Sequence, residues 1–156
     1  MNHTAYLSLG SNLGEREAYL TEAVRILEER AGKVVSRSAF YYSEPWGFTS
    51  DNGFANICIA LQTPLSPIEL LDATQQIERE LGRTKKSSAG VYSDRVIDID
   101  LIMIDDLVCR DERLTLPHPL MQERLFVLEP LRAIAPTLRH PVLQKSLDDL
   151  INLLIK

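Results

Sequence analysis

The sequence predicts an α+β fold in which helices flank a mainly antiparallel sheet. Segments rich in Ile, Val and Leu alternate with amphipathic segments in the order β-α-β-β-α-β, and a helical tail follows. This order is typical of ferredoxin-like folds. The chain has 156 residues, of which 45% are hydrophobic and 25% charged, so we expect one domain over residues 1–156 with one sizeable core.

The first half of the chain supplies three strands and one helix. The helix is predicted from Leu13 to Ala31, with Asn12 as its N-cap and Gly32 as the residue that ends it. A loop rich in Gly, Pro, Asp and Asn covers residues 43–53. The predicted strands cover residues 4–9, 33–42 and 54–62.

The second half opens with the clearest helix start in the sequence. Ser66 is a good N-cap, Pro67 suits the first helical position, and Glu69 completes a capping box. The helix is predicted to reach Leu81, and Gly82 is predicted to end it.

The fourth predicted strand, RVIDIDLIMID, covers residues 95–105 and follows a basic loop that contains RTKK. Asp105 and Asp106 then predict a turn, and LVC predicts a return strand. Residues 114–136 predict a loop with short helical turns broken by prolines. The segment SLDDLINLLI predicts a capped amphipathic helix.

Charge and hydropathy bear on the expected partners. The chain carries 17 Lys and Arg against 22 Asp and Glu, whereas a nucleic-acid-binding domain is expected to be basic. No apolar run approaches the roughly 20 residues that cross a bilayer. The start, MNHTAYLSLG, lacks the pattern of a signal peptide. We therefore expect a cytoplasmic protein that binds neither nucleic acid nor membranes, with Cys58 and Cys109 as buried free thiols.

Two aspartates stand one residue apart near the start of the fourth predicted strand. Alternation places Asp98 and Asp100 on one face of the strand, together with Ile102 and Ile104. One interpretation is a solvated strand face. The nearby Arg95 and the RTKK segment favour another, in which the carboxylates hold Mg²⁺ and the basic side chains bind a polyphosphate.

Three other motifs have both a structural and a functional interpretation. The turn SLGSNLG lacks the glycine spacing of known nucleotide-binding loops, which favours a simple tight turn. His118 lies between two prolines, without further His or Cys at zinc-ligand spacing, which makes a transition-metal site improbable. It is either a surface loop residue, which is the favoured interpretation, or, with Arg113 and Arg124, a donor to a phosphate chain. Trp46, Phe48 and Phe54 either pack on the core or, with Asn56, hold a flat heterocycle.

Taken in order, these motifs resemble the 6-hydroxymethyl-7,8-dihydropterin pyrophosphokinase family. The matching segments are YLSLGSNLG, FYYSEPWG, FANICIAL, ELLDATQQIERELGR, DRVIDIDLIMID and RLTLPHPLMQERLFVLEPL. The resemblance implies an ATP-dependent transferase of folate biosynthesis, which moves pyrophosphate from ATP to the pterin hydroxymethyl group and releases AMP. We expect a monomer, and the chain length suits a monofunctional enzyme.

The resemblance also implies roles for individual residues. Asp98 and Asp100 would bind two Mg²⁺ ions, with Arg83 and Arg95 as further catalytic residues. The residues implied to contact ATP are Gln75, Glu78, Lys85, Arg95, Leu101, Arg113, Thr115, His118 and Arg124. The residues implied to surround the pterin are Gly10, Ser43, Pro45, Trp46, Phe54, Asn56 and Phe126. Phe54 and Phe126 would stack on the pterin ring.

The chain departs from the family pattern in the loop before the aspartates. VYSDR stands where many members carry RWGPR, so Tyr92 replaces a tryptophan, and this loop is longer than usual. Lys85 stands where arginine is common, and lysine cannot form a bidentate fork with phosphate. We expect loops 43–53 and 83–94 to close over bound substrates.

Two alternatives stay open from the sequence. Another magnesium-dependent phosphoryl or nucleotidyl transferase would not need Phe54, Asn56 and Phe126 around a flat ring. A non-catalytic ligand-binding module of the same fold would not need Asp98 and Asp100 or their basic neighbours, and it would not consume ATP.

Overall fold

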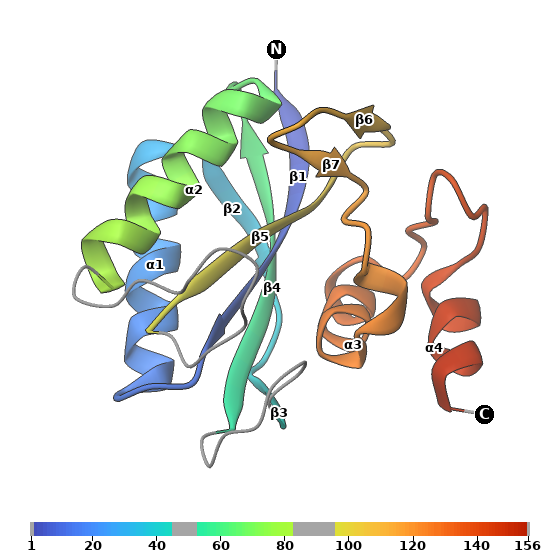
Figure 1. The fold of residues 1–156 in the computed structure, drawn as a ribbon, viewed down its shortest axis with the longest axis horizontal. Helices are drawn as coiled ribbons and strands as arrows, with labels where there is room; N and C mark the ends of the chain where they lie inside the picture. Colours follow the sequence, from blue (N-terminus) through green and yellow to red (C-terminus); the bar gives the residue numbers. More distant parts are fainter. Residues whose placement is uncertain (1, 45–52, 83–95, 156) are drawn as a thin grey trace.

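An antiparallel sheet forms the centre of the molecule (Figure 1). The computed structural model describes residues 2–44, 53–82 and 96–155. The strands are β1 (His3–Ser11), β2 (Lys33–Arg37), β3 (Tyr41–Ser43), β4 (Phe54–Thr63) and β5 (Asp98–Ile104). They lie in the order β2-β4-β1-β5, and β3 also pairs with β4. Every pairing is antiparallel, so the predicted α+β fold with a ferredoxin-like core is confirmed.

Helices cover both faces of this sheet (Figure 1). The helices are α1 (Arg16–Arg30), α2 (Pro67–Gly82), α3 (Leu125–Ile134) and α4 (Leu147–Ile155). α1 and α2 pack on one face, while the predicted helical tail forms α3 and α4 and packs on the other. Smaller elements connect β5 to α3, namely β6 (Cys109–Arg110), β7 (Thr115–Leu116) and a 3-10 turn, η1 (Met121–Glu123).

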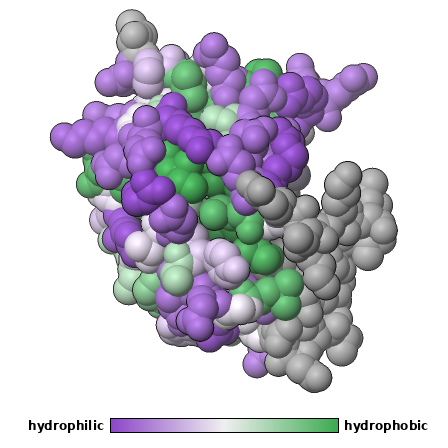
Figure 2. Space-filling view, turned by 90° about the vertical axis from the view of Figure 1, so that its left-hand side faces the viewer, coloured by the Kyte–Doolittle hydropathy of each residue, from purple (hydrophilic) through white to green (hydrophobic). Residues whose placement is uncertain are grey.

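The outer surface of the α1 and α2 layer is mainly hydrophilic, with apolar areas between the charged side chains (Figure 2). Arg30 of α1 pairs there with Glu80 of α2 at 2.8 Å. The inward sides of these helices are apolar, and Leu20, Leu27 and Ile77 are fully buried against the sheet. Apolar burial thus places the two helices, and the exposed ion pair adds little stability.

A bulge in β5 changes which side chains share a face. Tyr6 of β1 pairs with Met103 but Leu7 pairs with Leu101, so Ile102 is an extra residue in β5. Ile102 packs on the α3 side, as predicted, but Ile104 packs in the core under α1 and α2. The prediction that Ile104 shares the face of the aspartates is therefore wrong, because the extra residue reverses the alternation.

Two local predictions, the cap of the first helix and the unbroken strand over residues 33–42, are wrong. Asn12 does not cap α1, which begins at Arg16 with Glu15 at the N-cap position and no side-chain cap. The strand predicted over residues 33–42 divides into β2 and β3 at Ser38, whose hydroxyl accepts the Cys58 N–H at 3.0 Å. A side-chain acceptor there replaces a ladder hydrogen bond and interrupts the strand.

The predicted capping box of α2 is confirmed. The Ser66 N–H donates to the Glu69 carboxylate at 2.8 Å, and the Glu69 N–H donates to the Ser66 hydroxyl at 3.2 Å. Pro130 was predicted to break a helix, but it lies inside α3, where burial of Leu128 and Leu131 on both sides offsets the lost hydrogen bond. The predicted return strand at LVC is limited to β6, which pairs with β7 rather than with the main sheet.

Both cysteines are free thiols, as predicted. Cys58 is fully buried in β4, and burial raises the pKa of its thiol to about 12, which makes it unreactive. Cys109 is only half-buried, so the prediction that both thiols are buried is confirmed for Cys58 and wrong for Cys109. Among the described residues, no helix is long and apolar enough to cross a membrane.

Candidate active site

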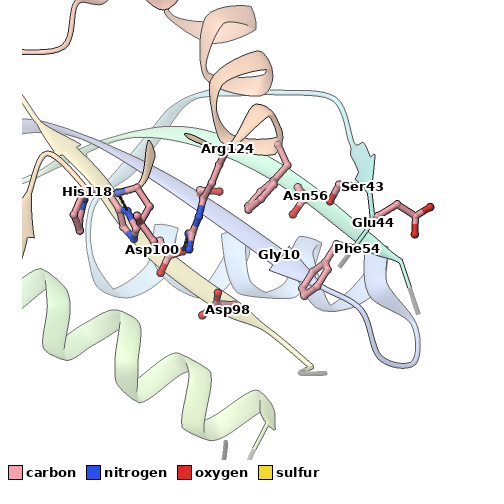
Figure 3. A pocket seen from close by; sticks show the side chains of 13 residues that line it. Gly10, Ser43, Glu44, Phe54, Asn56, Asp98, Asp100, His118 and Arg124 are labelled. Atoms are coloured by element: carbon pink, nitrogen blue, oxygen red, sulfur yellow. Dashed lines mark hydrogen bonds and ion pairs between the residues drawn. The ribbon is translucent and has the colours of Figure 1, made fainter. Parts of the chain in front are cut away.

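A first cavity, of about 330 Å³, lies on the α3 face of the sheet beside the start of that helix (Figure 3). Its floor is a row of three side-chain positions, Asn56 on β4, Gly10 on β1 and Asp98 on β5, which pair directly across the strands. Paired residues project from the same face of a sheet. The other lining residues are Ser8, Ser43, Glu44, Phe54, Asp100, His118, Pro119, Leu120, Arg124 and Phe126.

Gly10 creates the hollow in this floor. A Cβ at this position would lie 3.0 Å from Asn56 Oδ1 and 3.4 Å from the Phe54 ring. The Asn56 side chain is buried, and its amide nitrogen donates to the Tyr41 carbonyl at 2.9 Å and to the Ser43 hydroxyl at 2.8 Å. The Asn56 carbonyl oxygen therefore faces the space over Gly10, where it can accept a hydrogen bond from a ligand.

A second cavity, of about 320 Å³, lies along the outer edge of β5. Its walls come from α2, β5 and the segment around β7. Its lining residues are Leu71, Gln75, Glu78, Asp98, Ile99, Asp100, Leu101, Glu112, Arg113, Leu114, Thr115, His118 and Pro119. Asp98, Asp100, His118 and Pro119 line both cavities, so the two spaces meet at the aspartates.

The two aspartates project from β5 toward this junction (Figure 3). Arg124, at the start of α3, reaches toward Asp100, and its guanidinium lies 3.6 Å from the carboxylate. Only 7% of the Arg124 side chain is exposed, and the guanidinium also lies over the Phe126 ring, 5.6 Å from its centroid. A buried arginine close to one aspartate offsets part of the repulsion between the pair.

Glu78 of α2 supports the strand that carries the aspartates. Its carboxyl group accepts the Ile99 N–H at 2.6 Å, at the edge of β5 that no other strand covers among the described residues. Burial, and next the negative charge of Asp98, raise the pKa of Glu78 to about 8. At pH 7 the Glu78 carboxyl is therefore mostly protonated, and a cation bound beside Asp98 would lower its pKa.

His118 reaches the junction because of the bulge in β5. The Ile102 carbonyl accepts the His118 N–H at 2.8 Å, which fixes the backbone of His118 beside the strand. The Nδ1 atom of His118 accepts the Leu120 N–H at 3.1 Å, and burial, with the charge of Arg124, lowers the pKa of the ring to about 4. The ring is therefore neutral near pH 7 and carries its proton on Nε2, as a donor.

The family model described as 7,8-dihydro-6-hydroxymethylpterin-pyrophosphokinase (HPPK) matches residues 6–136. The chain belongs to the HPPK family. The resemblance noted from the sequence motifs is thereby confirmed.

Two relatives agree with this membership in HPPK, and a solved structure shares the fold. The chain is 50% identical over 137 residues to 2-amino-4-hydroxy-6-hydroxymethyldihydropteridine pyrophosphokinase of Porphyromonas gingivalis, covering 87% of this chain and 92% of that protein. It is 44% identical over 135 residues to the Bacillus subtilis protein of the same name, covering 86% and 79%. The crystal structure of Plasmodium falciparum HPPK-DHPS shares the fold, with a TM-score of 0.78 at 15% identity. That match covers 97% of this chain but 44% of the Plasmodium chain.

The HPPK residues implied for the two substrates separate between the two cavities. Every described residue implied for the pterin lines the first cavity: Gly10, Ser43, Phe54, Asn56 and Phe126. The described residues implied for ATP that line the second cavity are Gln75, Glu78, Leu101, Arg113, Thr115 and His118. Two residues implied for ATP depart from this separation, because Arg124 lines the first cavity and His118 lines both. Pro45, Trp46, Arg83, Lys85, Tyr92 and Arg95 lie outside the described residues, as do most of loop 43–53 and all of loop 83–94.

Several lining residues of this HPPK chain were missed by the sequence reasoning. Ser8 lies next to Asp100 in the floor of the first cavity, and its alternation with Gly10 along β1 was a signal that could have found it. Glu44 and Leu120 also line that cavity, and Glu112 lines the second. No local pattern marked these three, because their place depends on how distant segments pack.

Asp98 and Asp100 form a donor set that fits Mg²⁺. This ion binds through one or two carboxylates and takes its other ligands from water and substrate phosphates. The described residues contain no group of three or more His, Cys, Asp or Glu side chains arranged to hold a metal. The pair therefore suits a cation that arrives with a phosphate ligand rather than one held by the protein alone.

The low pKa of His118 predicts a pH-dependent stability. Between about pH 6.5 and pH 4 the unfolded chain binds a proton at His118 that the folded chain does not, so stability falls as the pH falls, by about 2–3 kcal/mol. Glu78, with its raised pKa, contributes a slope of opposite sign, so the effect must be read from a variant. Urea unfolding of His118→Asn across this range should show a smaller loss. Parallel curves for both proteins would contradict the prediction.

Proposed function

We propose that the first cavity binds the pterin, the second binds ATP, and Asp98 and Asp100 act where the two substrates meet. As a member of the HPPK family, the protein is an ATP-dependent diphosphokinase of folate biosynthesis. It transfers pyrophosphate from ATP to the hydroxymethyl group of 6-hydroxymethyl-7,8-dihydropterin and releases AMP. The observation that supports the site assignment is the separation of the two implied residue sets between two cavities with a shared acidic wall.

The first cavity suits a flat ring with hydrogen-bond donors on its edge. Phe54 and Phe126 supply aromatic faces for stacking on the two sides of the ring. The Asn56 carbonyl oxygen accepts from a ring donor over Gly10, because both amide hydrogens of Asn56 are already donated to Tyr41 and Ser43. Pro45 and Trp46 complete this proposed site through the family resemblance.

The second cavity suits ATP, with its phosphates toward the aspartates. Arg113 is oriented above it by Asp72 and by Gln75, whose side-chain oxygen lies 3.4 Å from the guanidinium. His118 donates from Nε2, and Thr115 and Leu101 lie along the same wall. The family resemblance adds Arg83, Lys85 and Arg95 as cationic partners of the phosphates, and Arg124 beside Asp100 adds another.

Positioning and charge neutralisation account for the reaction. The pterin hydroxyl oxygen attacks the β-phosphorus of ATP, the bond from that phosphorus to the α-phosphate oxygen breaks, AMP leaves with the bond's electron pair, and the hydroxyl proton passes to water. Two Mg²⁺ ions, when held by Asp98 and Asp100, supply the positive charge that stabilises the phosphate oxygens. The two cavities hold the nucleophile and the phosphate chain on either side of the aspartates, which makes the attack effectively intramolecular.

We further propose that residues 1–156 form one domain and act as a cytoplasmic monomer. Two alternative functions predict different products from ATP. A phosphoryl transferase would release ADP, a nucleotidyl transferase would release pyrophosphate, and a binding module would consume no ATP.

Product analysis tests the proposed function. The protein should convert ATP to AMP in the presence of Mg²⁺ only when 6-hydroxymethyl-7,8-dihydropterin is added, as judged by chromatography of the nucleotides. Formation of ADP would contradict pyrophosphoryl transfer. Binding of both compounds without turnover would support the binding module instead.

Gly10→Ala is expected to weaken pterin binding selectively. The added methyl group occupies the floor of the first cavity, so the pterin Kd should rise about tenfold or more while the ATP Kd stays unchanged. Calorimetric titration with each ligand measures both values, and the ATP value controls for folding. A pterin Kd equal to that of the wild type would show that the ring does not lie over Gly10.

A further inference from the structure

We propose that Tyr41 is a positioning residue that joins the strand wall and the helix wall of the first cavity and so sets the space available to the pterin. The strand wall consists of Ser43, Phe54 and Asn56, and the helix wall is Phe126 at the start of α3. The inference rests on the proposed function, because it assigns the first cavity to the pterin.

Tyr41 orients the strand wall through its backbone. Its carbonyl oxygen accepts one hydrogen of the Asn56 amide at 2.9 Å, and the Ser43 hydroxyl accepts the other at 2.8 Å. Both acceptors belong to β3, so the position of this short strand on β4 decides which way the amide points. With both hydrogens held by β3, Asn56 Oδ1 is left to face the cavity over Gly10.

Tyr41 holds the helix wall through its side chain. Its hydroxyl donates to the Glu129 carboxylate on α3 at 2.8 Å. Glu129 lies three residues after Phe126, so both side chains lie on the same face of the helix. Burial, together with the bond to Glu129, raises the pKa of Tyr41 to about 12, so the hydroxyl keeps its proton and remains a donor at neutral pH.

Apolar packing alone would leave the position of α3 less well defined. Val127, Leu128 and Leu131 bury the helix against the sheet, but such contacts have little directional preference. The hydrogen bond from Tyr41 is directional and joins α3 to β3 beside the cavity. Glu129 is itself held, because Arg132 lies 3.5 Å from its other oxygen and 3.0 Å from Asp148 of α4.

The next residue provides a matched control. Tyr42 also donates its hydroxyl to a glutamate, Glu17 of α1, at 2.7 Å. Tyr42 does not line the first cavity, and its side chain is largely exposed at 56%. Tyr41→Phe and Tyr42→Phe therefore each remove one tyrosine–glutamate hydrogen bond from the same strand, but only the first bond joins the two walls.

The test compares these variants in binding and turnover. Tyr41→Phe should raise the Kd and KM for 6-hydroxymethyl-7,8-dihydropterin about five- to tenfold, with the ATP Kd unchanged and kcat at saturating pterin within about twofold of the wild type. Tyr42→Phe should leave all four values unchanged. Glu129→Ala should reproduce the effect of Tyr41→Phe, whereas Glu129→Gln, which keeps an acceptor for the hydroxyl, should restore most of the pterin affinity.

Each result that would overturn this inference has a different meaning for the proposed function. Equal pterin Kd values for Tyr41→Phe, Tyr42→Phe and the wild type would overturn the positioning role while leaving the proposed function intact. A parallel loss of pterin and ATP affinity, with a lower melting temperature, would also overturn it and indicate a general structural role. A wild-type protein that binds no pterin would overturn the proposed function and this inference together.

Discussion

Asp98→Asn and Asp100→Asn are each expected to lower turnover by about a thousandfold or more while the protein stays folded. Asparagine keeps the size of the side chain but removes the charge that would bind Mg²⁺ and orient the phosphates. At position 100 the change removes the ion pair with the buried Arg124, and the lost repulsion from Asp98 offsets only part of that cost, so the free energy of unfolding should fall by about 1–3 kcal/mol. Steady-state AMP production and urea unfolding measure the two quantities.

Asp106→Asn is the matched control for these variants. Asp106 lies in the turn after β5, is exposed, and lines neither of the two cavities. It should retain wild-type turnover. Calorimetry with Mg²⁺ and a non-hydrolysable ATP analogue should also show weaker metal binding in the two β5 variants only. If either variant retained turnover within tenfold of the wild type, the assignment of that carboxylate to the metal would be wrong.

Gly32→Ala is expected to cost about 3 kcal/mol or more of folding stability. A Cβ at this position would overlap the Gln62 carbonyl oxygen and lie 2.9 Å from the Gln62 carbonyl carbon and the Thr63 Cα. This backbone cannot move aside easily, because Gln62 pairs with Thr4 of β1 and with Lys33 of β2. Guanidinium unfolding of the variant should show the loss as a lower midpoint, or the protein should fail to fold.

Gly82→Ala provides the comparison for this glycine. Gly82 is the last residue of α2, and an added Cβ would meet Val96 at an ordinary contact distance of 3.8 Å. The substitution should therefore be neutral or should stabilise the helix by up to about 1 kcal/mol. Similar losses for both glycine variants would mean that the close approach of Gly32 to β4 is not the cause.

Helices and strands could be predicted where one local sequence pattern extended over consecutive residues. The capping box at Ser66 and Glu69 marked the start of α2 correctly, because its two hydrogen bonds join residues three apart. The strand prediction failed at Ser38, whose hydroxyl accepts a hydrogen bond from Cys58 of β4 and so separates β2 from β3. The predicted alternation of side chains failed beyond Ile102, because a bulge depends on the pairing of two strands rather than on either strand alone.

The candidate site was predictable only in part. The common face of Asp98 and Asp100 follows from strand alternation over three residues. The sequence motifs and the family resemblance indicated roles for Asn56 and His118, but nothing in the local sequence determines how these side chains are held. The orientation of the Asn56 amide depends on acceptors in β3, and the position of His118 depends on the carbonyl of the bulged Ile102.

The sequence by itself determined the order of strands and helices, the cap of α2 and the pairing of two carboxylates on one strand face, since backbone geometry repeats these features over a few residues. Only the tertiary structure decided that the aspartates separate two cavities, that Arg124 and Glu78 approach them, and that α3 lies over the first cavity. These contacts join segments more than 20 residues apart. Their geometry depends on how the apolar faces of the whole chain are buried together, which no local pattern encodes.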